Sequence, residues 1–280
     1  MTSPRNIVPR KLETKGELMK TITVGIDMGS KNVKVVILKD GQVLAKGLAP
    51  SGFDQKAAAE ELFNKVLQKA HLSRDDINHI VATGAGKDAA PYANNEISMM
   101  GGDALGGTFL FPSARTIIDV GAEASRAVRC DEKGKMIDFV INEKCAAGAG
   151  TFIEAMARAL EVKLEEIGPL SLKAEKAVPM NAQCTIFAES EVVSLIHEKT
   201  SKADIARAIH DAIANRIASI TRRLGIQKDV ALVGGVAKNV GFIASLQRTL
   251  GVDLLIPGEP EFVGALGAAL APLKDRRNAK

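Results

Sequence analysis

Apolar and polar positions alternate in two ways along the chain, and each pattern predicts a different kind of element. Short apolar runs that end in glycine turns are typical of buried strands, whereas longer segments place Ala, Leu, Phe and Val at helical spacing. Strands are predicted within 21–30, 79–87, 114–121 and 229–235, and helices at 55–70, 150–161, 185–199, 202–224, 239–250 and 260–272. Residues 88–113 are expected to be rich in loops. The alternation indicates an α/β protein, with a largely parallel sheet in the second half.

One pattern occurs twice. Asp27-Met28-Gly29 and Asp119-Val120-Gly121 each close an apolar run and open a β-hairpin, and Lys39-Asp40-Gly41 is a typical hairpin turn. The repeat predicts two lobes built on related sheets. The predicted lobes are 19–112, closed by the C-terminal helix 260–272, and 113–259, after a disordered extension at 1–18.

Composition narrows the class of protein. A net charge of +4 without a basic run and interleaved aromatic residues argues against nucleic acid as a partner. No apolar stretch approaches the roughly 20 residues of a membrane span. Three cysteines without framework spacing argue against a disulfide scaffold, so the expected setting is a reducing cytoplasm.

The repeated turn suits phosphate binding. Gly29 and Ser30 can present backbone N–H groups and a hydroxyl to phosphate, Lys34 adds positive charge, and Asp27 can hold Mg²⁺. One such turn alone is better explained as an ordinary hairpin. Together with the second copy and the later Gly234-Gly235 turn, it resembles the layout of the actin-like ATPases, which implies a two-lobed actin-like (ribonuclease H-like) fold.

Two cysteines suit a metal centre. Cys145 and Cys184 each precede a predicted helix start, where the helix dipole and unpaired N–H groups favour a thiolate. They supply only half of the ligands that a tetrahedral zinc site or an iron–sulfur cluster requires. Cys130 lies outside these motifs and is expected not to be a ligand. The four histidines lack zinc-site spacing; they are His71, His79, His197 and His210.

A more specific resemblance comes from several motifs together. VGIDMGSKNVK, VATGAGK, INEKCAAGAGTF, CTIFAESEV, VGGVAKN and EFVGALGAAL resemble the BadF/BadG/BcrA/BcrD-type ATPases. These are the activators of 2-hydroxyacyl-CoA dehydratases and the ATPase subunits of benzoyl-CoA reductases. The resemblance implies one [4Fe–4S] cluster shared by two subunits, with Cys145 and Cys184 as the ligands from this chain.

The same resemblance implies the remaining roles. ATP or ADP with Mg²⁺ is expected to bind the turns at Asp27 and at Asp119 and Gly121, and Glu123 replaces the glutamine that positions the attacking water. The adenosine is expected near Gly234 and Gly235. Gly264 is expected to lie close to the same cleft. Glu123 lies in the stretch GAEASRAVRC, which looks closer to the smaller ATPase subunit of benzoyl-CoA reductase.

The function predicted on this basis is ATP-driven, low-potential electron transfer to a catalytic acyl-CoA-processing partner, in a benzoyl-CoA reductase. A homologous ATPase subunit would complete the cluster, and ferredoxin or flavodoxin would supply the electron. The alternative is a homodimeric activator of a 2-hydroxyacyl-CoA dehydratase. Other classes are an actin-like regulatory or chaperone ATPase, and a small-molecule kinase with Asp103 as its base, although an Asp in a loop is more often a turn or cap residue.

Overall fold

The computed structural model describes residues 21–142, 148–180 and 184–278. The chain forms two compact units. The first unit contains the chain up to Ser113, the segment Cys130–Met136 and the chain from Phe262 onward. The second contains Ala114–Arg129 and Ile137–Glu261. Residues 1–18, where an extension is expected, lie outside the described residues.

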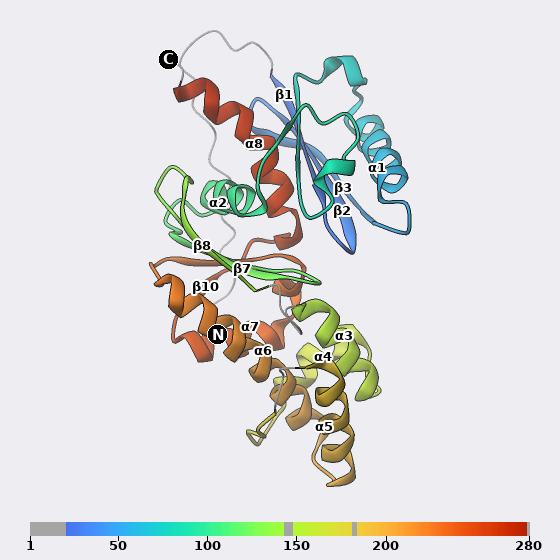
Figure 1. Ribbon diagram of the computed structural model, residues 1–280, viewed down its shortest axis with the longest axis vertical. Coiled ribbons are helices and arrows are strands. Elements are labelled where there is room, and N and C mark those ends of the chain that lie inside the picture. Colours follow the sequence, from blue (N-terminus) through green and yellow to red (C-terminus); the bar gives the residue numbers. More distant parts are fainter. Residues whose placement is uncertain (1–20, 143–147, 181–183, 279–280) are drawn as a thin grey trace. The chain divides into compact units, whose positions relative to one another are not determined.

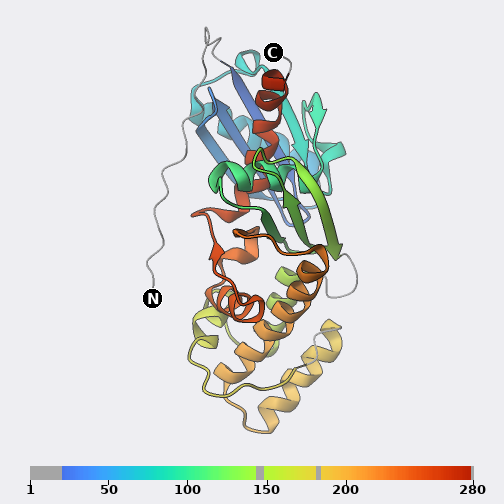
Figure 2. The ribbon, with the colours of Figure 1, turned by 90° about the vertical axis from the view of Figure 1, so that its left-hand side faces the viewer.

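The first unit is a mixed five-stranded sheet between helices (Figures 1 and 2). Its strands are β1 (Ile22–Met28), β2 (Asn32–Lys39), β3 (Gln42–Pro50), β4 (His79–Thr83) and β5 (Asn95–Glu96). Its helices are α1 (Gln55–Ala70), α2 (Met99–Leu110) and α8 (Val263–Asn278). The strand order is β3-β2-β1-β4-β5; β1 to β3 are antiparallel, and β4 and β5 continue parallel to β1.

Alternation along β1 separates its two faces. Val24, Ile26 and Met28 are buried in one cluster with the apolar side chains of α1. The residues between them face α8, where the hydroxyl of Thr23 donates a 2.7 Å hydrogen bond to the Ala269 carbonyl. The strand therefore packs helices on both faces and places Asp27, at its end, on the α8 face.

The local predictions for this unit are largely confirmed. The helix expected at 55–70 is α1, which Asp54 caps by accepting a hydrogen bond from the Ala57 N–H. Asp40 and Gly41 have φ of 53° and 75°, as a two-residue hairpin turn of the primed type requires.

The second unit repeats the sheet of the first. Its strands are β6 (Thr116–Val120), β7 (Ser125–Cys130), β8 (Met136–Asn142), β9 (Val230–Val233) and β10 (Leu254–Leu255). Their order is β10-β9-β6-β7-β8, and read from the β8 edge it matches β3-β2-β1-β4-β5 of the first sheet strand for strand. The expectation of a largely parallel sheet is wrong for this unit, because β6 and β7 are antiparallel whereas β6, β9 and β10 are parallel.

Helices form most of the second unit's core. They are α3 (Ala149–Ala159), α4 (Leu164–Ser171), α5 (Thr185–His197), α6 (Lys202–Leu224) and α7 (Val240–Leu250). The long helix α6 buries one apolar face, including Ile209, Ile213 and Ile217, against its neighbours. No helix of the described residues is both long and apolar enough to cross a membrane.

The expectation of a loop around Asp103 is wrong. Met99–Leu110 form α2, capped by the hydroxyl of Ser98, and Asp103 is buried in it. Glycine disfavours an isolated helix, but here it allows close packing. A Cβ on Gly106 would lie 2.3 Å from the Val263 carbonyl oxygen of α8. The helix is therefore stabilised by contact with α8, which local propensity does not reveal.

Candidate nucleotide and cluster site

The first phosphate-type turn is built around an ion pair. Asp27 and Lys34 lie opposite one another on β1 and β2, and the Lys34 Nζ is 2.9 Å from the Asp27 Oδ2, with about 15% of each side chain exposed. The Ser51 hydroxyl donates a 2.6 Å hydrogen bond to the carbonyl of Gly29. The turn is thus held by the ion pair between β1 and β2 and by Ser51, which follows β3. Ser30 is exposed at the tip of the turn.

Two glycines make room at this turn. A Cβ on Gly29 would lie 2.7 Å from the Lys34 Nζ. A Cβ on Gly84, which has φ of 96°, would lie 2.6 Å from the Asp27 Oδ1. The sequence indicated a glycine turn after β4 but not this contact. Gly84 immediately follows Thr83, which is the register partner of Asp27 on the parallel strand β4. The position of this glycine at the end of β4 was the signal that could have predicted the contact with Asp27.

The second unit repeats this arrangement residue by residue. Asp119 lies opposite Arg126 on β6 and β7, and the two form an ion pair with side chains 8% and 12% exposed. A Cβ on Gly234, which has φ of 87°, would lie 2.1 Å from the Asp119 Oδ1. Gly234 therefore corresponds to Gly84, and Arg126, which was not among the predicted site residues, corresponds to Lys34.

The second turn is bonded to the first turn of α3. The N–H of Gly150 donates to the Gly121 carbonyl at 3.1 Å. The Ala122 carbonyl accepts from the Thr151 N–H at 3.1 Å and from its hydroxyl at 3.0 Å. Glu123 is exposed in this turn, beside Gly148. The predicted phosphate turn of the second unit and the start of α3 thus form one hydrogen-bonded structure.

The glycines expected near the nucleoside lie in different units. Gly234 donates its N–H to the Pro260 carbonyl at 2.9 Å. Gly235 follows it at the start of a short 3₁₀ helix, Gly235–Lys238, and no other described part of the chain lies within 4 Å of where its Cβ would be. Gly264 belongs to α8 of the first unit. It lies beside Asp27 and Asp103.

The three cysteines have different surroundings. Cys184 is half-buried and is the N-cap residue of α5, where its side chain makes no capping hydrogen bond. Cys130 is buried, with its sulfur 3.4 Å from the Thr108 hydroxyl. Cys145 lies outside the described residues. Among those that are described, no three His, Cys, Asp or Glu side chains gather as a metal site.

Helix α5 presents a large apolar surface next to Cys184. Ile186 and Phe187 are 71% and 73% exposed, and Val193 and Ile196 on the same helix are also exposed. Single exposed apolar side chains are common, but several on one helix mark a surface suited to a partner.

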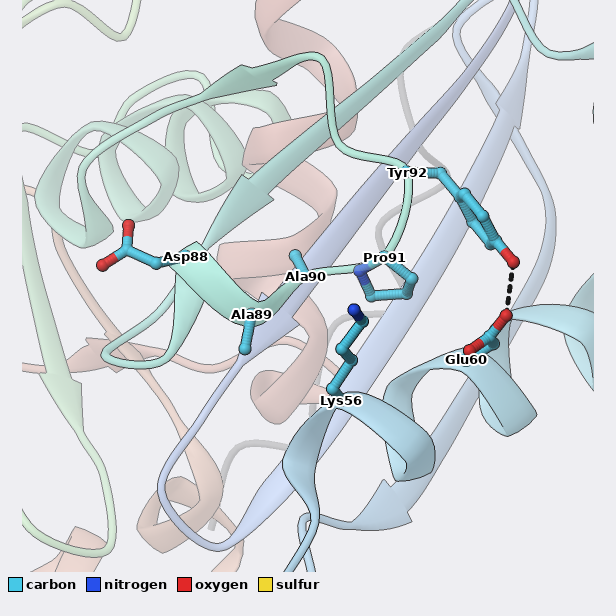
Figure 3. Close-up of a pocket in the computed structure, with 7 residues that line it drawn as sticks. All are labelled: Lys56, Glu60, Asp88, Ala89, Ala90, Pro91 and Tyr92. Carbon is cyan, nitrogen blue, oxygen red and sulfur yellow. Dashed lines mark hydrogen bonds between the residues drawn. The ribbon is translucent and has the colours of Figure 1, made fainter.

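A separate pocket of about 330 Å³ lies on the first unit (Figure 3). Lys56 and Glu60 of α1 line it together with Asp88–Tyr92, and Glu60 accepts a hydrogen bond from the Tyr92 hydroxyl. That hydrogen bond raises the pKa of Tyr92. The Arg74 guanidinium lies 3.6 Å from the centre of the Tyr92 ring. None of the predicted site residues that the structure describes lines this pocket, so it is distinct from the candidate nucleotide site.

The repeated Asp turns and sheets are matched in known proteins. The profile of the BadF/BadG/BcrA/BcrD ATPase family covers residues 24–271. The chain belongs to this family. The predicted family and the actin-like ATPase fold are thereby confirmed. The fold also occurs in the ethanolamine utilization protein EutJ from Carboxydothermus hydrogenoformans, at 16% identity and a TM-score of 0.59 over 91% of each chain.

Among curated members of the BadF/BadG/BcrA/BcrD family, an activator of lactoyl-CoA dehydratase from Anaerotignum propionicum is 40% identical, over 89% of this chain and 96% of its own. A 2-hydroxyisocaproyl-CoA dehydratase activator from Clostridioides difficile is 36% identical, over 92% and 97%. One of the benzoyl-CoA reductase subunits of Thauera aromatica is 32% identical, over 89% and 92%. The similarity therefore favours the activator alternative over the benzoyl-CoA reductase prediction.

Two solved structures that resemble this chain are also named as a component or an activator of a dehydratase. The (R)-2-hydroxyglutaryl-CoA dehydratase component A from Acidaminococcus fermentans has 38% identity and a TM-score of 0.87, covering 93% of this chain and 100% of its own. The activator of the 2-hydroxyisocaproyl-CoA dehydratase from Clostridium difficile, solved with bound ADPNP, has 36% identity and a TM-score of 0.85, over 92% and 97%.

Proposed function

We propose that this ATPase is the activator of a 2-hydroxyacyl-CoA dehydratase, which transfers an electron to the dehydratase at the cost of ATP. The observation that carries the proposal is similarity over nearly the whole chain, at 36–40% identity, to proteins named as such activators. We further propose that ATP with Mg²⁺ binds the turns at Asp27 and Asp119. The relative solved with bound ADPNP supports the binding of an adenine nucleotide.

Cys145 and Cys184 would hold half of a [4Fe–4S] cluster, and a second subunit would hold the other half. Cys184 fits this role, because it is a half-buried residue at a helix N-terminus and its side chain makes no capping hydrogen bond. When bound, such a cluster accepts and releases single electrons at a potential tuned by its surroundings. The exposed apolar side chains of α5 are suited to contact with the second subunit.

The contacts at Thr151 support a link between nucleotide and cysteine. Two hydrogen bonds from Thr151 and one from Gly150 join the turn at Gly121–Glu123 to the start of α3. In the sequence, Cys145 precedes Ala149, the first residue of this helix, by four positions. A phosphate that repositions the turn would therefore move the start of α3, while Glu123, exposed in the same turn, would orient the attacking water.

The test is strictly anaerobic purification of the chain, followed by iron and sulfide analysis and an activation assay with a 2-hydroxyacyl-CoA dehydratase and reduced ferredoxin or flavodoxin. We expect iron, sulfide and ATP-dependent activation. Cys184→Ser should lose the iron and the activation but keep nucleotide binding, whereas Cys130→Ser, the matched control, should keep all three. An iron-free wild-type chain that binds nucleotide would contradict electron transfer and favour a regulatory ATPase.

A benzoyl-CoA reductase component is the second candidate, supported by the 32% identical relative from Thauera aromatica. The two candidate functions predict complexes of different subunit composition. An activator is expected to be a homodimer that associates with its dehydratase transiently, whereas a reductase component is expected to require a different ATPase subunit. Mass measurement of the anaerobic protein, alone and with each partner, distinguishes them.

A further inference from the structure

Glycines allow the elements around Asp27 to touch through their backbones. A Cβ on Gly25 of β1 would lie 1.9 Å from the carbonyl oxygen of Ala265, and one on Gly267 of α8 would lie 1.8 Å from that of Gly102. Helix α8 is therefore pressed against both β1 and α2. This packing places Asp103, the residue after Gly102, close to the end of β1.

The two carboxylates flank one point. A Cβ on Gly264 would lie 3.6 Å from the Asp103 Oδ1 and 3.7 Å from the Asp27 Oδ2, which are its nearest described neighbours outside its own stretch of helix. Because residue 264 has no side chain, oxygen atoms of both carboxylates border the same small space. Asp103 is only 3% exposed.

A buried hydroxyl lies beside Asp27 and Gly102. Thr83 is 1% exposed, and its Oγ1 has no hydrogen-bond partner among the described residues. It is the register partner of Asp27 on β4, so both side chains leave the sheet on the same face. Its Oγ1 is 3.7 Å from where a Cβ on Gly102 would lie. A buried hydroxyl without a partner is costly, and a bound water would satisfy it.

Charge indicates what binds here. Asp27 and Lys34 alone form a neutral pair, which gives a cation no net attraction. Asp103 brings a second carboxylate to the edge of the same space. Carboxylates and a hydroxyl are hard oxygen donors, and Mg²⁺ in nucleotide sites keeps several waters while it uses one or two carboxylates and the phosphates.

We propose that Asp103 acts with Asp27 in holding the hydrated Mg²⁺ of the bound nucleotide, while Thr83 accepts a hydrogen bond from a water of that shell. The inference rests on the proposed function in that it requires a bound nucleotide. The kinase prediction made Asp103 the base of a reaction with a second substrate. The present proposal instead makes Asp103 a carboxylate beside the metal ion during ATP hydrolysis, which has no second substrate.

The test is a titration of the protein–ADP complex with Mn²⁺, a magnesium substitute, in which electron paramagnetic resonance measures the free ion. Loss of a group in the outer metal shell typically weakens metal binding about 10–100-fold, so Asp103→Asn should weaken Mn²⁺ binding by about tenfold or more. ADP binding measured in EDTA should be unchanged. Thr108→Val, at a buried polar position of the same helix, is the control and should bind Mn²⁺ like the wild type.

Unchanged Mn²⁺ affinity in Asp103→Asn would overturn the inference and leave the proposed function intact. Failure of the wild-type chain to bind ADP at all would instead overturn both. Gly264→Ala is the second variant if Asp103→Asn does not fold. Its added methyl group meets neighbours at ordinary contact distances but occupies the space between the carboxylates, so it too should weaken Mn²⁺ binding, and unchanged affinity would refute the site.

Discussion

At the scale of single residues, the protonation of His210 makes the free energy of unfolding depend on pH. It is fully buried on α6, and burial lowers its pKa from 6.5 to about 4, against the opposing effect of Asp211. The unfolded chain takes up a proton near pH 6.5, whereas the folded chain resists it until about pH 4. The unfolded state therefore binds more protons in this window, and stability falls as the pH is lowered through it.

We expect His210 to remove about 3 kcal/mol of stability between pH 7 and pH 4, since one pKa unit corresponds to about 1.4 kcal/mol. Urea unfolding at several pH values measures this loss. His210→Gln should lack this part of the pH dependence. If the wild type and the variant lose stability in parallel across the window, the burial of His210 does not control it.

The two ion pairs of the repeated turns allow a matched comparison. Arg126→Met leaves the carboxylate of Asp119 buried without its partner, and breaking such a pair typically costs about 3–5 kcal/mol. Lys34→Met should cost less, because the Asp27–Lys34 pair is the more exposed of the two. Urea unfolding measures both losses. Asp119→Asn combined with Arg126→Met should recover part of the stability, and strictly additive losses would argue against the pairing.

At the scale of elements, the packing of α2 against α8 depends on the absence of side chains. Gly267→Ala would place a Cβ 1.8 Å from the Gly102 carbonyl oxygen, so the two helices must separate. Overpacking typically costs about 1–3 kcal/mol, and we expect at least that loss in thermal or urea unfolding. Gly264→Ala, one turn earlier on the same helix, is the control and should be far less destabilising. If Gly267→Ala and Gly264→Ala changed the stability equally, helix propensity and not packing would determine the effect of a glycine substitution in α8.

The elements that the sequence predicted, and those it did not, differ in what holds them together. Helix α1 follows from its own spacing and its Asp54 cap, and the β2–β3 turn follows from Asp40-Gly41. Helix α2 does not follow, because its glycines disfavour a helix until α8 is in place. The same long-range packing brings Asp103 to Asp27, and strand pairing brings Gly84 to Asp27. The aspartates and glycines of the turns were visible in the sequence, but these contacts were not.

At the scale of the whole molecule, each unit carries one Asp turn, and the proposed function requires both. A ligand that binds only the folded state at 100 times its dissociation constant stabilises by about 2.7 kcal/mol. We therefore expect MgADP to raise the melting temperature of the wild type. Asp27→Asn and Asp119→Asn should each abolish most of that rise, although the residues belong to different units. A variant that keeps the full rise would show that its turn does not hold the nucleotide.

The connection between equivalent strands differs most between the two halves of the chain. One helix, α1, lies between β3 and β4, whereas α3 to α6 lie between β8 and β9. This is the pattern that gene duplication followed by growth of one crossover would leave. The strand ends carry an aspartate in both halves, and Cys184 with the exposed face of α5 lies within the longer crossover. Under the proposed function, selection for a new protein partner can thus act on that crossover while selection for the nucleotide acts on the strand ends.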